Sequence, residues 1–190
     1  MRPGVGRLGG RRAGRLRTPP LGTGRLRLDP LRVADAAAMV AVLADPALYT
    51  FTGGEPPGLE DLRRRYAAQV AGHSPDGAEQ WHNWIVRRAD GGDAIGFVQA
   101  TVVDAGVAAD IAWVIGAPWQ GRGYATEAAQ ALVAWLREAG VAAITAHVHP
   151  DHGASARVAA RAGLAATDEV EDGERLWRLR SEEGQTSGGG

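Results

Sequence analysis

The chain has 190 residues, of which 45% are hydrophobic and 23% are charged, values that are ordinary for a soluble globular protein. This length suits one domain with a sizeable core and is too short to expect two. The sequence contains no cysteine, which excludes disulfides and thiolate chemistry. No apolar run approaches the ~20 residues that a membrane-spanning helix needs, so we expect a cytoplasmic protein with no membrane partner.

Charge is distributed unevenly along the chain. Residues 1–28 contain eight arginines and no acid, whereas residues 29–190 contain 13 basic and 22 acidic residues. Glycine and proline in residues 1–20 would break an amphipathic targeting helix, so we predict a disordered Arg/Gly-rich tail there. A nucleic-acid-binding arm is the alternative interpretation. The acidic remainder argues against nucleic acid as the main partner and suits a cationic or amine-bearing substrate.

The first half of the body predicts a strand, two helices and three further strands. Leu26 and Leu28 alternate with charged residues, as in a strand, and Leu59, Leu62 and Tyr66 recur at helical spacing. The expected elements are 25–29, 35–43, 59–70, 81–86, 95–103 and 110–115. Because the connections between the last three are too short for parallel crossovers, we expect an antiparallel meander.

The second half predicts helices alternating with strands. The expected elements are helix 126–139, strand 142–148, helix 152–162 and strands 164–167 and 175–179, each helix closed by a glycine. Residues 181–190 are polar and glycine-rich, so we predict a second disordered tail. The whole is a single α+β domain over residues 21–180, with a mixed, mostly antiparallel sheet of about six to seven strands flanked by about four helices.

The segment Gln120–Ala125 lies between a predicted strand and a predicted helix. Gly121 and Gly123 remove side chains where backbone N–H groups must approach an anion, and the N-terminus of the next helix adds unpaired N–H groups and a positive dipole end. The sequence contains no lysine, so a nucleotide-hydrolysing P-loop is excluded. The three-glycine dinucleotide fingerprint is also absent. An ordinary glycine turn before a helix is the alternative interpretation.

With its flanks, this loop resembles the GNAT superfamily of acyl-CoA-dependent N-acetyltransferases. The family signature of Gln or Arg, two residues, Gly, one residue, and Gly or Ala is filled by Gln120, Gly123 and Ala125. The stretches Trp119–Ala128, Leu21–Leu28 and Ser155–Leu164 are similar to the branch that includes ribosomal-protein N-terminal (alanine) acetyltransferases. The resemblance covers residues 21–180 and implies a GNAT-like fold.

The resemblance implies acetyl-CoA as co-substrate, a primary amine as acceptor and no metal. The amine attacks the thioester directly, without a covalent enzyme intermediate. The cofactor-binding residues implied by the resemblance are Trp113, Val114, Ile115, Gln120, Gly121, Arg122, Gly123, Tyr124, Ala125, Thr126, His152 and Ser155.

Two residues are candidates for catalysis by the same resemblance. Asp110 stands where relatives often carry a Glu, and is expected to accept the amine proton directly or through water; a solvated strand-end acid is the alternative. Ser155 matches a serine near the cofactor sulfur, and a local helix cap is its alternative role. His152 replaces the family's Asn, and Ala159 stands where many members have a tyrosine acid.

Other residues have weaker assignments. Tyr49, Phe51 and Tyr66 lie where relatives form the acceptor site, so we expect them to shape it. The string of His147, His149 and His152 invites a zinc interpretation, but no acidic ligand is obvious and we expect no metal.

We therefore expect transfer of an acetyl group from acetyl-CoA to a peptide or protein N-terminus, or to a small amine. A non-catalytic acyl-CoA sensor is the alternative, favoured by the altered residues around the loop. A homodimer is an open alternative to a monomer.

Overall fold

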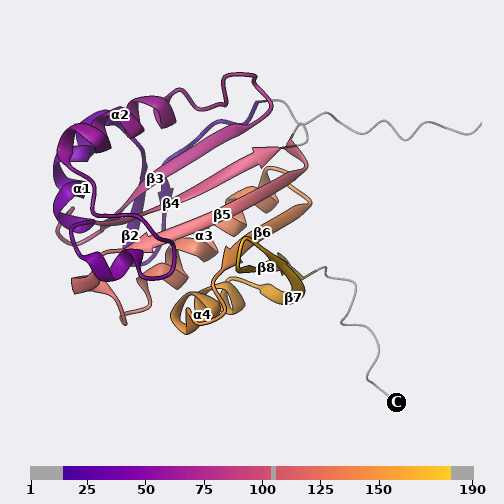
Figure 1. Ribbon diagram of the computed structural model, residues 1–190. Helices are drawn as coiled ribbons and strands as arrows, with labels where there is room; N and C mark the ends of the chain where they lie inside the picture. Colours follow the sequence, from indigo (N-terminus) through magenta and orange to yellow (C-terminus); the bar gives the residue numbers. More distant parts are fainter. Residues whose placement is uncertain (1–14, 104–105, 181–190) are drawn as a thin grey trace, which may run out of the picture.

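The computed structural model describes residues 15–103 and 106–180 (Figure 1). The described chain forms one sheet in the order β1-β2-β3-β4-β5-β6-β8-β7. The strands are β1 (Leu21–Gly22), β2 (Leu26–Pro30), β3 (Gln80–Arg88), β4 (Ala94–Val103), β5 (Ala108–Ile115), β6 (Ala143–Val148), β7 (Leu164–Glu171) and β8 (Glu174–Leu179). The α-helices are α1 (Ala36–Val42), α2 (Leu59–Val70), α3 (Tyr124–Glu138) and α4 (Gly153–Arg161).

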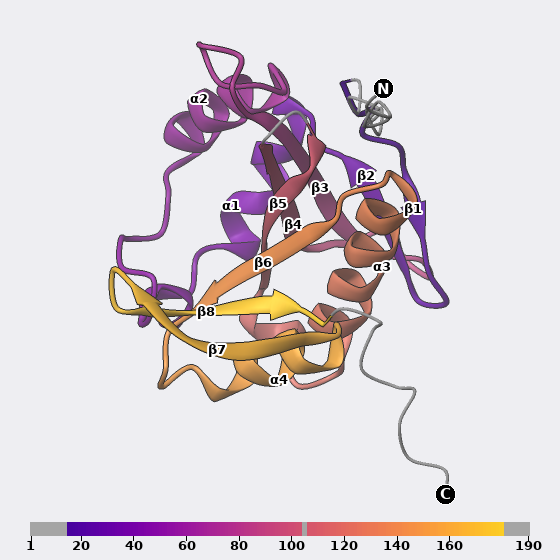
Figure 2. The same ribbon diagram turned by 90° about the vertical axis from the view of Figure 1, so that its right-hand side faces the viewer.

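Helices cover both faces of the sheet. Figure 2 shows α3 on the opposite side of the sheet from α1 and α2. The adjacent β3 residues Trp84 and Ile85 are both fully buried, because successive strand side chains point to opposite faces. Trp84 joins the core beneath α3, which includes Leu132, and Ile85 joins the core beneath α1 and α2, which includes Leu62.

The sheet divides at the junction of β5 and β6. These strands are the parallel pair of the sheet, and their pairing extends from Ala108–Ala143 to Asp110–Thr145. From Thr145 to Val148, β6 pairs with β8 instead. Residues Ile111–Ile115 of β5 thus pair with β4 on one side and, within the described sheet, with no strand on the other. An edge of backbone N–H and C=O groups is thereby left open for a ligand.

The structure confirms the expected fold class and element order. The 80–115 segment is the predicted antiparallel meander, and α2 spans the predicted residues. The described sheet has eight strands, slightly more than expected, because the two-residue β1 is too short to leave a periodic pattern. The helix α3 begins at Tyr124, two residues before the predicted start.

Residues 15–20, which the sequence analysis included in the N-terminal tail, contact β3. The Leu16 amide donates to Gln80 Oε1 at 2.7 Å, and Trp84 Nε1 donates to the Pro19 carbonyl at 2.7 Å. A hydrogen bond of 2.8 Å joins Thr18 Oγ1 and His82 Nδ1. The tail predictions for 1–14 and 181–190 lie outside the described residues.

Candidate active site

The loop after β5 takes a backbone conformation that requires glycine. Gly121 and Gly123 have φ of +75° and +81°, in the left-handed region that L side chains rarely adopt. Gln120 anchors the loop, since its Nε2 donates to the Ile115 carbonyl at the end of β5 over 2.9 Å. The loop therefore connects the open edge of β5 to the N-terminus of α3.

The backbone amides of this loop face outward. Gly121, Arg122 and Gly123 are exposed, and the N–H groups from Gly121 to Thr126 donate to no carbonyl or side chain of the described chain. The first bonded amide of the turn belongs to Glu127, which donates to Gly123 O at 3.1 Å. Together with the positive end of the 15-residue α3, these amides form a cradle suited to a phosphate or other anion.

A clamp from the β1–β2 turn holds this cradle. Arg25 Nη2 lies 2.6 Å from Glu127 Oε2, and its Nη1 donates to the Arg122 carbonyl at 3.1 Å. Thr23 Oγ1 donates to Glu127 Oε1 at 2.5 Å, and the Arg25 guanidinium lies 4.8 Å from the centre of the Tyr124 ring. Although partial burial opposes it, these hydrogen bonds lower the pKa of Glu127. The stretch Leu21–Leu28 resembles the family branch in sequence, but that resemblance does not predict this clamp.

The cofactor residues expected on β5 lie along the open edge. Trp113 and Ile115 pack toward α3, and Val114 packs toward α1 and α2, so their side chains belong to the core. Their backbone groups on the β6 side are the part that a ligand can reach. The Gln120–Ile115 hydrogen bond joins this edge to the loop, and the assignment of these residues to coenzyme A stays a prediction.

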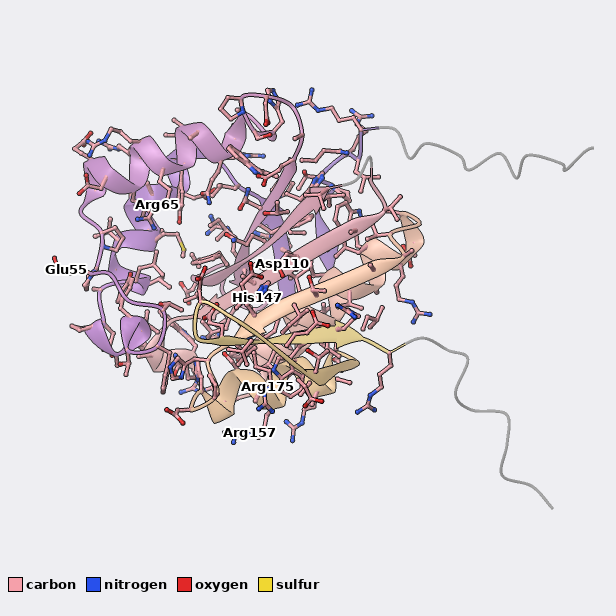
Figure 3. The ribbon with its side chains drawn as sticks, turned by 45° about the vertical axis from the view of Figure 1, so that its right-hand side comes forward. Glu55, Arg65, Asp110, His147, Arg157 and Arg175 are labelled. Atoms are coloured by element: carbon pink, nitrogen blue, oxygen red, sulfur yellow. The ribbon has the colours of Figure 1, made fainter. Side chains whose placement is uncertain are left out.

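Asp110 lies where β5 and β6 diverge, in a small polar cluster (Figure 3). Its Oδ1 accepts a hydrogen bond from Thr145 Oγ1 at 3.0 Å and lies 3.2 Å from His147 Nδ1. The Nε2 atom of His147 lies 3.6 Å from Glu171 Oε2. Burial raises the pKa of Asp110, against the opposing effects of His147 and Thr145. A carboxylate with a raised pKa, partnered by an imidazole, is a candidate for general acid–base catalysis.

The hydrogen bonds at Asp110 leave one oxygen free. Both partners contact Oδ1, and Oδ2 accepts no hydrogen bond from a described residue. The side chain is 46% exposed, so a substrate amine or a water can reach Oδ2. The sequence analysis singled out Asp110 and missed His147 as its partner. Strand alternation was the available signal, since it places Thr145 and His147 on one face of β6.

The three histidines of the string do not share one set of partners. His147 faces Asp110 and Glu171, whereas His149 and His152 lie against Phe51, with ring-centroid separations of 5.3 and 4.5 Å. Burial and the nearby His149 lower the pKa of His152. Within the described ranges, no three His, Asp or Glu side chains are placed to hold a metal ion together.

Ser155 lies in the first turn of α4, half-buried. The N-cap residue of α4 is His152, and no side chain caps this helix, so the alternative of Ser155 as a local cap has no support in the geometry. Its hydroxyl makes no hydrogen bond to a described residue. Ser155 as a donor to the cofactor sulfur stays a prediction.

The structure brings two of the three expected acceptor-site residues near one another, because the charge of Tyr49 affects the pKa of Tyr66, and it places Phe51 at the start of α4. Tyr49 donates its hydroxyl to the Leu43 carbonyl at 3.0 Å, and Phe51 stacks on His152 at the start of α4. Tyr66 lies on the inner face of α2, where burial raises its pKa to about 12, and it lines a pocket between α2 and the sheet that is partly open to solvent.

This pocket and Asp110 share one face of the sheet. Asn83 and Gln99, which line the pocket, are paired across β3 and β4. Gln99 is paired with Ala112, and its neighbour Thr101 with Asp110. Because directly paired residues point to the same side of a sheet, Asp110 faces the side on which the pocket opens.

The described chain thus combines an α+β sheet that splits between β5 and β6, an amide cradle beside the split and a polar cluster within it. Residues 25–165 match the family described as the acetyltransferase (GNAT) domain. The chain belongs to this family of acetyltransferases.

Solved structures have the same fold. An acetyltransferase of the GNAT family from Bacillus anthracis is 19% identical, with a TM-score of 0.71 over 85% of this chain and 98% of that one. RimL, the ribosomal L7/L12 alpha-N-protein acetyltransferase, in complex with coenzyme A is 15% identical, with a TM-score of 0.69 over 84% and 97%. The aminoglycoside acetyltransferase AAC(6')-Ib in complex with coenzyme A is 21% identical, with a TM-score of 0.68 over 83% and 95%.

No curated protein matches the chain in sequence. None of the described helices is long and apolar enough to cross a membrane.

Proposed function

We propose that this protein is an acetyl-CoA-dependent N-acetyltransferase that acts on a primary amine in the cytoplasm. One observation carries the proposal: the outward-facing amides of Gly121–Thr126 lead directly to the open edge of β5, and that edge ends at Asp110. A pyrophosphate in the cradle and a pantetheine arm along the strand would bring a thioester toward the carboxylate. The coenzyme A complexes of RimL and AAC(6')-Ib, which share the fold, support this choice of donor.

The reaction needs two proton transfers. The substrate ammonium loses its first proton to Asp110 Oδ2, directly or through water, while Thr145 and His147 hold Oδ1 in place. The neutral amine then attacks the thioester carbonyl carbon, the C–N bond forms, and the C–S bond breaks. Backbone N–H groups of the open β5 edge stabilise the developing oxyanion. The thiolate leaves with the second nitrogen proton, relayed by Ser155 or water, and gives free coenzyme A and the acetylated amine.

A thiol-release assay over a panel of primary amines and short peptides tests the proposal. We expect turnover with at least one acceptor class. If coenzyme A binds but every acceptor is silent, catalysis is refuted and the acyl-CoA sensor remains. That alternative has specific support, because Ala159 stands where many relatives have a tyrosine acid.

The Asp110→Asn variant tests the assigned base. We expect kcat/KM to fall by on the order of 10²–10⁴, the usual contribution of a general base, with unchanged affinity for acetyl-CoA. The raised pKa of Asp110 means that the folded state favours the protonated form, so its contribution to stability is present below the unfolded pKa and lost as pH rises through the folded pKa. At pH 7 the variant should therefore have an equal or higher Tm. Asp90→Asn, in an exposed turn, is the matched control. Full activity of Asp110→Asn would remove this residue from the mechanism.

A further inference from the structure

The pocket under α2 is built from one face of the helix and the underlying strands. Leu62, Arg65, Tyr66 and Gln69 line it from α2, at the i, i+3, i+4 and i+7 spacing of a single helical face. Asn83, Ile85, Phe97 and Gln99 line it from β3 and β4, with Leu31 and Leu43 at its side. The pocket thus combines an apolar wall with several polar groups, and it is open to solvent.

Arg65 differs from the two arginines before it. Arg63 pairs with Glu60 at 2.6 Å, and Arg64 pairs with Asp61, each across one turn of α2. Arg65 has no carboxylate partner in the described chain, and of the three arginines it is the one that lines the pocket. Figure 3 shows Arg65 below α2, across from Asp110 and His147 on the sheet. The helix therefore directs one uncompensated positive charge to the pocket.

The other polar groups of the pocket are free to bind a ligand. The side-chain amides of Gln69, Asn83 and Gln99 make no hydrogen bond to a described residue, and no acid is present in the lining. Tyr66 is 4% exposed, and its hydroxyl makes no hydrogen bond within the described residues. Burial keeps this phenol neutral by raising its pKa to about 12, so it remains a hydrogen-bond donor.

Asp35, an acid whose charge acts on the pocket residue Tyr66, is already paired with an arginine. Asp35 raises the pKa of Tyr66 by its charge, but its Oδ1 lies 2.6 Å from Arg87 Nη2. It is therefore not available to balance Arg65. The pocket favours an anion and donates hydrogen bonds, whereas the cluster at the split of the sheet contains two acids, Asp110 and Glu171.

The two regions are close enough for one small molecule. Asp110 and Gln99 are diagonal neighbours on β5 and β4, which corresponds to about 7–8 Å between such positions. A molecule with its amine at Asp110 can therefore extend along the sheet into the pocket. Its two ends would meet opposite charges: acids at the amine, and Arg65 at the far end.

We infer that the acceptor is a small primary amine that also carries a carboxylate, and that Arg65 binds this carboxylate while a short aliphatic linker lies against Phe97. The inference rests on the proposed function for the amine end alone. It excludes diamines and polyamines as good acceptors, because their second ammonium would meet Arg65 with no acid in the pocket lining. Arg65 is a specificity-determining residue and has no part in proton transfer.

Binding measurements test this inference whether or not turnover is seen. The probes are ω-amino acids of increasing length (glycine, β-alanine, 4-aminobutanoate and 6-aminohexanoate), each beside the alkylamine and the diamine of matching length. Affinities are measured by calorimetry and by NMR shifts with coenzyme A present, on the wild type, Arg65→Gln and Arg64→Gln. Arg64→Gln removes the same charge from the same helix outside the pocket, and it serves as the matched control.

We expect at least one amino acid probe to bind tenfold or more tightly than its alkylamine and diamine partners. A charge-assisted hydrogen bond contributes roughly 1.5–3 kcal/mol, so Arg65→Gln should weaken that probe by about 10- to 100-fold and leave the alkylamine unchanged. Arg64→Gln should alter none of them. Tighter binding of diamines, or equal loss for all probes in Arg65→Gln, overturns the inference. A silent thiol-release assay with this binding pattern intact would refute the proposed function alone.

Discussion

The residue pair at the split of the sheet links pKa to activity. Burial raises the pKa of Asp110, and the charge of a protonated His147 opposes that rise. Glu171, from β7, acts in the same direction as burial and also lies near His147. The protonation of Asp110 is therefore set by groups from three strands, and its two partners on β6, His147 and Thr145, lower its pKa.

His147→Gln should shift the pH dependence of activity in a definite direction. Without His147, only the Thr145 hydrogen bond opposes burial and Glu171, so the pKa of Asp110 rises further and the acid limb of kcat/KM moves to higher pH. The measurement is a pH–rate profile from about pH 4 to about pH 9. Thr145→Val, which removes a neutral donor to the same oxygen, is the comparison: it should move the limb the same way by less. A limb that moves to lower pH would show that another group titrates in the profile.

At the scale of single residues, the sequence predicts the cradle but not the contacts between distant segments. Gln120, Gly121 and Gly123 form a local pattern whose spacing is fixed by the turn itself. A short stretch of sequence is therefore enough to recognise it. Arg25 and Glu127 are 102 residues apart, and no periodic pattern in the sequence predicts their contact. For the same reason, the sequence suggests His147 as a metal ligand and does not predict its contact with Asp110.

At the scale of elements, periodicity predicted the secondary structure well where elements have a buried face. The helix α2 places Leu62 and Tyr66 in the core, and its boundaries were predicted from that spacing. The alternating burial of β4 likewise marks a strand with one face in each core. The two-residue β1 was not predicted, because a pair of residues has no period. The exposed second half of β7 was not predicted either, because its solvated residues show no apolar alternation.

A side chain at the second glycine should strain the loop that opens α3. Gly123 has φ of +81°, and an L residue there costs about 1–2 kcal/mol. Gly140, just past the end of the same helix, has φ of +85° and open space around its Cα. We expect Gly123→Ala and Gly140→Ala to lower the free energy of unfolding by similar amounts, measured by urea titration.

The two variants should differ in their affinity for coenzyme A. A changed backbone at Gly123 reorients the amides of the cradle, so we expect its Kd to rise by at least tenfold in calorimetry. Gly140 lies at the opposite end of α3 and should leave the Kd unchanged. Equal affinities in the two variants would mean that the cradle is not where the pyrophosphate binds.

On the scale of the whole molecule, an aromatic cluster joins the N-terminal segment to β3 and α3. His82 is 3% exposed, and it lies against Trp84 of its own strand and Trp135 of α3, with ring separations of 6.2 and 5.1 Å. Thr18 reaches it from the segment that precedes the sheet. Its Nε2 has no hydrogen-bond partner in the described residues. A protonated imidazole would therefore place an unpaired charge inside the core.

The stability of the fold should depend on pH through this residue. Burial, followed by the charge of Arg15, lowers the pKa of His82 to about 4, whereas the unfolded chain has the ordinary value of about 6.5. A depressed pKa means that the contribution to stability is present above the unfolded pKa and is lost as pH falls through the folded one. Between pH 7 and pH 4 the wild type should therefore lose up to about 3 kcal/mol from this group, since one pKa unit corresponds to about 1.4 kcal/mol.

The variant His82→Phe isolates this contribution from that of the many carboxylates. It keeps an aromatic ring among the two tryptophans and removes the proton-binding nitrogen, so the difference in unfolding free energy between wild type and variant should change between pH 7 and pH 4 in the variant's favour. Urea titrations at both pH values give that difference, and the carboxylates common to the two proteins cancel. A difference that is the same at both pH values would show that His82 is protonated alike in the folded and unfolded states, contrary to its burial among Trp84, Trp135 and the segment at Thr18.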